Sequence, residues 1–203
     1  MAEGLFRKVA VRIPAALVAA RFLIALVLLA DSLDGKTGLG FVVLFVVAFL
    51  SDVFDGIIAR RLGVASPRLR QWDGYADILL YSVVLISIRL THPLMIQRYF
   101  LWISALLLLQ VISWIFSLIK FGKMTSYHSY IAKLWGLSLF AATIGIFYFE
   151  SERVGLVPVV IGFISIVEDI TMTAILPCWK NDILTVYQAL QVRRTHEQRA
   201  KSP

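Results

Sequence analysis

The stretch from Gly38 to Ile58 reads GLGFVVLFVVAFLSDVFDGII, and it is the part of the sequence that decides the fold. Its first 14 residues carry no charge. A transmembrane helix needs roughly 20 mostly apolar residues at a rise of about 1.5 Å each, so this run is long enough to cross a bilayer. Two aspartates follow within the same run, where ionisable side chains are costly and usually functional.

The composition of the whole chain agrees with a membrane protein. Of its 203 residues, 59% are hydrophobic and 16% are charged, with a mean hydropathy of +0.80. A soluble domain is nearer 45–50% apolar and about 25% charged, so this chain has too few polar residues to cover its surface with water. A single cysteine, Cys178, excludes a disulfide scaffold. The basic residues behind the net charge of +7 lie mostly in the loops and termini that flank the apolar stretches, so we expect no nucleic-acid partner.

Six apolar stretches are separated by loops that carry turn residues and charges. We therefore predict an all-α integral membrane fold with six transmembrane helices in a single membrane domain, comprising a core over 13–179 and a cytoplasmic basic tail over 180–203. The spans are Ile13–Ala30, Gly38–Ile58, Ile78–Ile88 extended backwards through Asp73 and Asp77, Tyr99–Ile119, Ile131–Phe149 and Val154–Leu176.

The first 12 residues have the pattern of a short amphipathic helix on the membrane surface. Apolar residues recur there at helical spacing, and basic residues occupy the other positions. The same segment could instead be the n-region of a signal peptide, although the apolar run that follows is long for its h-region and five more spans come after it.

The lysines and arginines predict the orientation in the membrane. With six alternating spans, 15 of them fall on the side that holds both termini and four on the other side, with Arg21 inside the first span. The positive-inside rule therefore places both termini in the cytoplasm, and a bacterial inner membrane is favoured. Attraction of basic residues to anionic membrane lipids explains part of the same bias.

Four aspartates form two pairs near the cytoplasmic side. Asp52 and Asp55 are three residues apart, and Asp73 and Asp77 are four apart, so each pair shares one face of its helix. The pairs can converge only if a positive charge offsets their repulsion, and carboxylate oxygens are the ligands that Mg²⁺ or Mn²⁺ prefers. The alternative is that they are interfacial caps and salt-bridge partners of Arg60, Arg61, Arg68 and Arg70.

Small residues accompany the first aspartate pair. Gly56 and Ala59 lie on the same helix face as Asp52 and Asp55, so a ligand can approach the backbone there. Arg60 follows and supplies a cation suited to phosphate.

The stretch DVFDGIIAR at 52–60 together with DGYAD at 73–77 resembles the signature of the CDP-alcohol phosphotransferases, D-x-x-D-G-x-x-A-R-x8-G-x3-D-x3-D. Seven of the eight fixed positions match, and Leu69 stands where the signature has its second glycine. The stretch IPAALVAAR at 13–21 is similar to the family's I-P-N-x-L-T-x-x-R, with Ala15 and Val18 replacing its Asn and Thr. The six-span layout fits the family over nearly the whole chain.

The resemblance implies an enzyme in which the hydroxyl of a small polar acceptor attacks the β-phosphorus of a CDP-linked lipid such as CDP-diacylglycerol and releases CMP. It implies Asp52, Asp55 and Asp73 as ligands of Mg²⁺ or Mn²⁺, and Asp77 as general base and possible further ligand. The implied donor-binding residues are Pro14, Asp52, Gly56, Ala59, Arg60 and the position of Leu69. The family also suggests a homodimer.

The acceptor is expected to be glycerol 3-phosphate or an inositol phosphate. The basic loop between spans four and five offers three candidates for its phosphate, Lys120, Lys123 and Lys133, although lipid anchoring explains these lysines equally well. His128 is expected to be an ordinary surface histidine. Glu168 and Asp169 inside span six are interpreted as a packing contact, with Arg21 as a partner, or else as a substrate contact.

Two other functions fit the sequence. A cluster of membrane carboxylates could belong to a divalent-cation transporter, although such sites usually lie near the midplane between repeated halves. Alternatively, Leu69, Ala15 and Val18 could mark a catalytically inactive member of the family.

Overall fold

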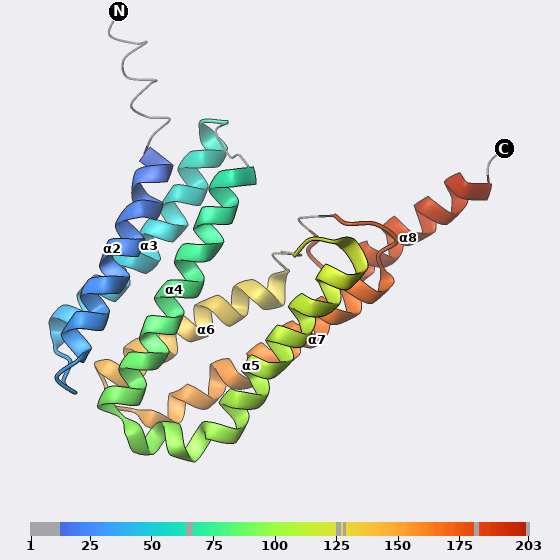
Figure 1. Cartoon of the computed structure of the whole chain (residues 1–203). Helices are drawn as coiled ribbons and strands as arrows, with labels where there is room; N and C mark the ends of the chain where they lie inside the picture. Colours follow the sequence, from blue (N-terminus) through green and yellow to red (C-terminus); the bar gives the residue numbers. More distant parts are fainter. Residues whose placement is uncertain (1–12, 64–66, 125–126, 128, 181–182, 202–203) are drawn as a thin grey trace, which may run out of the picture. The chain divides into compact units, whose positions relative to one another are not determined.

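The computed structural model describes residues 13–63, 67–124, 127, 129–180 and 183–201. Within these ranges the chain forms helices and no strand, as the predicted fold class requires. The helices are α2 (Ile13–Ser32), α3 (Leu39–Arg61), α4 (Pro67–Thr91), α5 (Pro93–Phe121), α6 (Tyr130–Phe147), the 3-10 turn η1 (Glu152–Gly155), α7 (Leu156–Ile175) and α8 (Val186–Lys201) (Figure 1). The predicted surface helix over 1–12 lies outside the described residues.

Six of these helices are long and apolar enough to cross a membrane, which confirms the predicted integral membrane fold. Many of their large apolar side chains are exposed, among them Leu101 at 74% and Ile119 at 80%. Apolar exposure on this scale is unfavourable in water and is expected of side chains that face lipid.

The fourth span begins earlier than predicted. Helix α5 starts at Pro93 and not at Tyr99. Proline is favoured at the first position of a helix, where its missing N–H has no partner to lose. Arg98 lies inside this helix, where arginine is a good helix former, and its side chain lies 3.8 Å from the carboxylate of Glu152.

Two glycines end membrane helices. Gly63 follows α3 and Gly122 follows α5, and both have a φ of +67°. This left-handed conformation is easy only for glycine, so both positions are typical helix stops. The amide of Gly122 donates to the carbonyl of Leu118, which closes the end of α5.

The chain divides into two compact units. The first comprises residues 1–97 and 147–150, and the second comprises 98–146 and 151–203. In the first unit α2 packs against both α3 and α4 (Figure 1). The core of this unit is formed by fully buried apolar residues of all three helices, among them Ala25, Leu28, Phe41, Phe45, Ala76 and Leu80.

The second unit is built around α7. A Cβ atom added at Gly162 on α7 would lie 2.8 Å from Nε1 of Trp135 on α6 and 3.1 Å from a methyl carbon of Leu106 on α5, so this glycine allows three helices to meet closely. Phe163 on the same helix contacts Trp102 edge to face, with ring centroids 6.5 Å apart.

The segment after residue 180, predicted only as a basic tail, contains the helix α8. Its Ala189 is fully buried and belongs to a small apolar cluster with Tyr127, Met172, Leu176 and Ile183. A basic composition therefore does not prevent this helix from packing against the end of α7, because Val186 and Val192 pack against the same cluster, while Tyr187 and Leu190 stay exposed.

Candidate active site

The two aspartates of α3 lie in the C-terminal half of this helix, and their side chains differ in exposure. The side chain of Asp55 is only 5% exposed, whereas that of Asp52 is 33% exposed. Their three-residue spacing puts both on the face of α3 that packs against α2, as the sequence predicted for a shared face.

The two aspartates of α4 are both partly exposed. The side chain of Asp73 is 30% exposed and that of Asp77 is 39% exposed, the largest value among the four carboxylates. The structure therefore brings together the two pairs that the spacing singled out.

One arginine of α2 joins all four carboxylates. The side chain of Arg21 is fully buried, and its Nη1 lies 3.1 Å from Oδ1 of Asp52, 2.9 Å from Oδ1 of Asp73 and 2.8 Å from Oδ1 of Asp77. Its Nη2 donates to Oδ2 of Asp55 at 2.5 Å. Four helix positions on α3 and α4 are thus tied to a single side chain on α2.

The carboxylates fit a divalent cation. One oxygen from each of Asp52, Asp55 and Asp73 lies within 4.8 Å of the other two, so the three could share one ion. With all four aspartates ionised, one guanidinium leaves an excess of three negative charges in the cluster. Hard oxygen ligands and excess negative charge are what Mg²⁺ and Mn²⁺ require. Asp77 is outside this group of three.

The predicted donor-binding residues of α3 lie beside the cluster. Ala59 is buried, Gly56 is half-buried and Arg60 is exposed. A Cβ atom at Gly56 would lie 3.3 Å from Nη1 of Arg60, so the arginine side chain folds back over the glycine. A phosphate that approaches this part of α3 would meet the Arg60 guanidinium next to a glycine that adds no side chain.

The other two positions of the predicted donor site are more enclosed. Pro14 is buried at the start of α2, and Leu69 is half-buried in the first turn of α4. The contacts that the structure shows for the four aspartates are made by the buried Arg21 of α2, and the alternative partners Arg60 and Arg61 are exposed. The side chains of the other two alternative partners, Arg68 and Arg70, lie outside the described part of the structure.

The three lysines predicted to bind the acceptor phosphate belong to the second unit. Lys120 donates from Nζ to the carbonyls of Thr173 and Ala174, both at 2.8 Å, and so caps the end of α7. The amine of Lys123 lies 4.9 Å from the ring centroid of Trp179, and that of Lys133 lies 5.5 Å from that of Tyr130. His128 lies outside the described residues.

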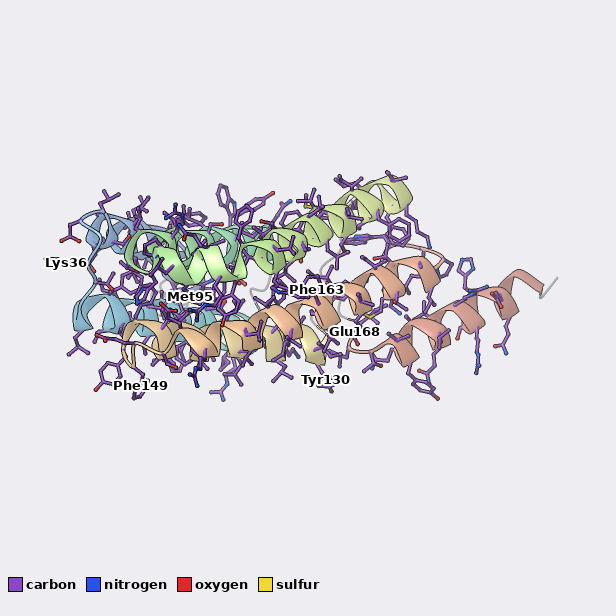
Figure 2. The ribbon with its side chains drawn as sticks, turned by 90° about the horizontal axis from the view of Figure 1, so that it is seen from below. Lys36, Met95, Tyr130, Phe149, Phe163 and Glu168 are labelled. Atoms are coloured by element: carbon purple, nitrogen blue, oxygen red, sulfur yellow. The ribbon has the colours of Figure 1, made fainter. Side chains whose placement is uncertain are left out.

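The acidic pair on α7 is different from the aspartate cluster. Buried Oε2 of Glu168 and Oδ1 of Asp169 have no hydrogen-bond partner among the described residues. Figure 2 shows Glu168 on the same helix as Phe163. The expectation that Arg21 partners this pair is wrong, because its guanidinium is held by the four aspartates.

Sequence reasoning found the aspartates and missed the role of Arg21. The signal was present, since a lone arginine inside an apolar span needs a buried partner of opposite charge. Which carboxylates it would meet depends on how α2 is rotated against α3 and α4, and this rotation cannot be read from spacing.

Comparison with known proteins supports one family. The sequence profile described as CDP-alcohol phosphatidyltransferase matches residues 11–175, which include every residue of the aspartate cluster and Arg21. Searches of curated proteins and of solved structures found no match. Because the profile covers most of the chain, the protein belongs to the CDP-alcohol phosphatidyltransferase family and is a transferase of this class.

Proposed function

We propose that the protein transfers a phosphatidyl-type group from a CDP-linked lipid, such as CDP-diacylglycerol, to the hydroxyl of a small polar acceptor and releases CMP. The family establishes the class of reaction, and the nature of donor and acceptor is our proposal. The transfer belongs to phospholipid biosynthesis. Glycerol 3-phosphate and an inositol phosphate are the acceptors we favour.

The observation that carries the proposal is that three of the four carboxylates could share a metal ion, while the fourth lies outside that group. Asp52, Asp55 and Asp73 each offer an oxygen to one point, whereas Asp77 is outside that group and has the most exposed side chain of the four. This arrangement supports three metal ligands and one carboxylate that can reach a substrate proton. A divalent ion held there would neutralise the diphosphate and the departing CMP.

The chain's own residues account for the remaining steps. Gly56 and Arg60 would seat the donor's phosphates against α3. Asp77 accepts the proton of the acceptor hydroxyl while the hydroxyl oxygen forms a bond to the β-phosphorus of the donor. The bond between that phosphorus and the oxygen of CMP then breaks, and CMP leaves with the bonding electrons.

A cytoplasmic site, with both termini on that side, suits this reaction because a lipid donor can enter sideways from the bilayer while a polar acceptor arrives from water. We base this orientation on the distribution of basic residues. Among the three lysines, Lys123 and Lys133 are better candidates than Lys120 for the acceptor phosphate, since Lys120 is committed to two backbone carbonyls. A homodimer, as the family suggests, is part of the proposal.

The alternative of cation transport has less support. The profile match places the chain in a transferase family, and all the residues of the metal-compatible group lie on α3 and α4 of the first unit. An inactive member would keep the fold and lose turnover, so an assay of CMP release distinguishes the proposed transferase from both alternatives.

The test is CMP release from CDP-diacylglycerol by purified protein in detergent, with a panel of acceptors that includes glycerol 3-phosphate, inositol phosphate, inositol and glycerol. We expect acceptor-dependent CMP release with one phosphorylated acceptor preferred. Asp31→Asn serves as matched control, because Asp31 is an exposed carboxylate at the end of α2 outside the cluster. Absence of CMP release with every acceptor would contradict the proposal.

A further inference from the structure

The guanidinium of Arg21 is placed where a divalent cation would act. It contacts Asp52, Asp55 and Asp73, the same three residues whose oxygens come within 4.8 Å of one another. A divalent cation and a guanidinium at such short range repel each other, and both draw on the same three carboxylates. We propose that Arg21 is a built-in counter-ion that competes with the divalent metal, so that metal binding displaces its Nη1 from the carboxylates. This inference rests on the proposed function only in requiring a metal at the cluster.

The contacts of Nη1 are too many for its hydrogens. This nitrogen carries two N–H groups, yet oxygens of Asp52, Asp73 and Asp77 all lie between 2.8 and 3.1 Å from it. At most two of these oxygens can accept a straight hydrogen bond at one time. Nη1 donates hydrogen bonds to Asp73 and Asp77, so Asp52, whose contact is an ion pair at 3.1 Å, is the carboxylate that a metal can take at little loss of hydrogen bonding.

The rest of the guanidinium is also incompletely satisfied. The Nε atom of Arg21 is buried and has no hydrogen-bond partner among the described residues. Buried polar groups are nearly always paired, so this position is held by the negative field of the cluster more than by a complete set of hydrogen bonds. Such an arrangement can yield when a stronger cation arrives.

The repulsion among the four carboxylates explains why the chain keeps the buried cation of Arg21 between them. Without metal, four carboxylates that meet between membrane helices would repel one another, and Arg21 contacts all four of them. Arg21 holds them together until metal binds. It is a positioning residue, and its charge should weaken metal binding while its absence should destabilise the metal-free protein.

The competition predicts an unusual variant. In Arg21→Met the cluster gains one unit of net negative charge at unchanged carboxylate number. We expect Mn²⁺ to bind this variant at least about tenfold more tightly than wild type, since removing a cation a few ångströms from the metal removes a large repulsion. Arg21→Lys keeps the charge and should stay within about threefold of wild type. Arg89→Met removes an exposed arginine of α4 and should bind like wild type.

The measurement is the Mn²⁺ dissociation constant of metal-free protein in detergent without donor, followed by the electron paramagnetic resonance signal of free Mn²⁺. If wild type binds no Mn²⁺, the metal centre of the proposed function is wrong. If wild type binds and Arg21→Met binds equally or more weakly, the metal centre stands and the competition is wrong.

Should Arg21→Met fail to fold, the wild-type protein labelled with ¹⁵N-arginine gives the answer. The Arg21 side-chain resonances are assigned by their loss in Arg21→Lys. We expect them to shift on Mg²⁺ titration with the same midpoint as Mg²⁺ binding. Resonances that stay unchanged at saturating Mg²⁺ would overturn the displacement.

Discussion

The molecule carries two groups of carboxylates inside membrane-spanning helices, and their surroundings differ. On α3 and α4 four aspartates surround one buried arginine, whereas on α7 Glu168 and Asp169 each keep a buried oxygen without a partner among the described residues. Spacings of three and four direct each aspartate pair to one helix face, while two adjacent residues of a helix point to different faces. In this molecule the acidic residues that converge on one site are the pairs with helical spacing.

The largest expected effect is on the first group. Asp55→Asn removes the most buried of the three residues that could share a metal. Metal stabilisation of the transferred phosphate is worth several kcal/mol, so CMP release should fall by about a thousandfold or more. Metal-dependent binding of CDP should disappear as well. The readout is CMP release and CDP affinity beside Asp31→Asn, and retained metal-dependent CDP binding would contradict the assignment of Asp55.

The next effect separates Asp77 from its neighbours. Asp77→Asn keeps size and removes the proton acceptor, and loss of a general base costs about 10²- to 10⁴-fold in turnover. Because Asp77 lies outside the group of three, donor affinity should change little. Turnover and donor affinity are measured side by side with wild type. Near-normal turnover would place the base elsewhere.

A third prediction concerns how substitutions in the two carboxylate groups change the unfolding temperature of the protein, beginning with the aspartate cluster. Removing one partner of a buried ion pair leaves an uncompensated charge and costs about 3–5 kcal/mol. Arg21→Met should therefore unfold at a clearly lower temperature than wild type in metal-free buffer, and added Mn²⁺ should restore part of the loss. An unchanged unfolding temperature without metal would show that Arg21 does not hold the cluster together.

A substitution in the acidic pair on α7 is expected to raise the unfolding temperature of the protein instead of lowering it. Asp169 has a buried oxygen that finds no partner in the described part of the chain, and an unsatisfied buried group costs about 1–3 kcal/mol, more if charged. Asp169→Leu replaces the buried carboxyl group by an apolar side chain of similar shape, so it should leave CMP release within about twofold of wild type and raise the unfolding temperature by a few degrees. Strong loss of CMP release with unchanged stability would instead support a substrate contact at this pair.

The smallest effect concerns Lys120, which donates to the last carbonyls of α7. A cation at a helix C-terminus contributes about 0.3–1 kcal/mol, so Lys120→Gln should lower the unfolding temperature by only a degree or two. The KM for a phosphorylated acceptor should rise more in Lys123→Gln than in this variant. The reverse order would return Lys120 to the acceptor site.

Much of the fold could be predicted from the sequence because each span is long, apolar and closed by turn residues. Spacing also predicted that the aspartates would share helix faces, and the structure confirms that they meet. The partner of Arg21 could not be predicted, because it depends on how three helices are rotated against one another. Helix α8 was missed because its packing rests on single buried residues such as Ala189, which leave no strong periodicity.

The central claim is that Asp52, Asp55 and Asp73 hold a divalent ion without which no phosphatidyl group is transferred. It is tested most directly by CMP release from CDP-diacylglycerol, with the preferred acceptor present, after exhaustive chelation and then during titration with buffered Mn²⁺ or Mg²⁺. We predict no turnover after chelation and full recovery in wild type and Asp31→Asn, but not in Asp55→Asn. Full turnover by the chelated wild-type protein would contradict the account.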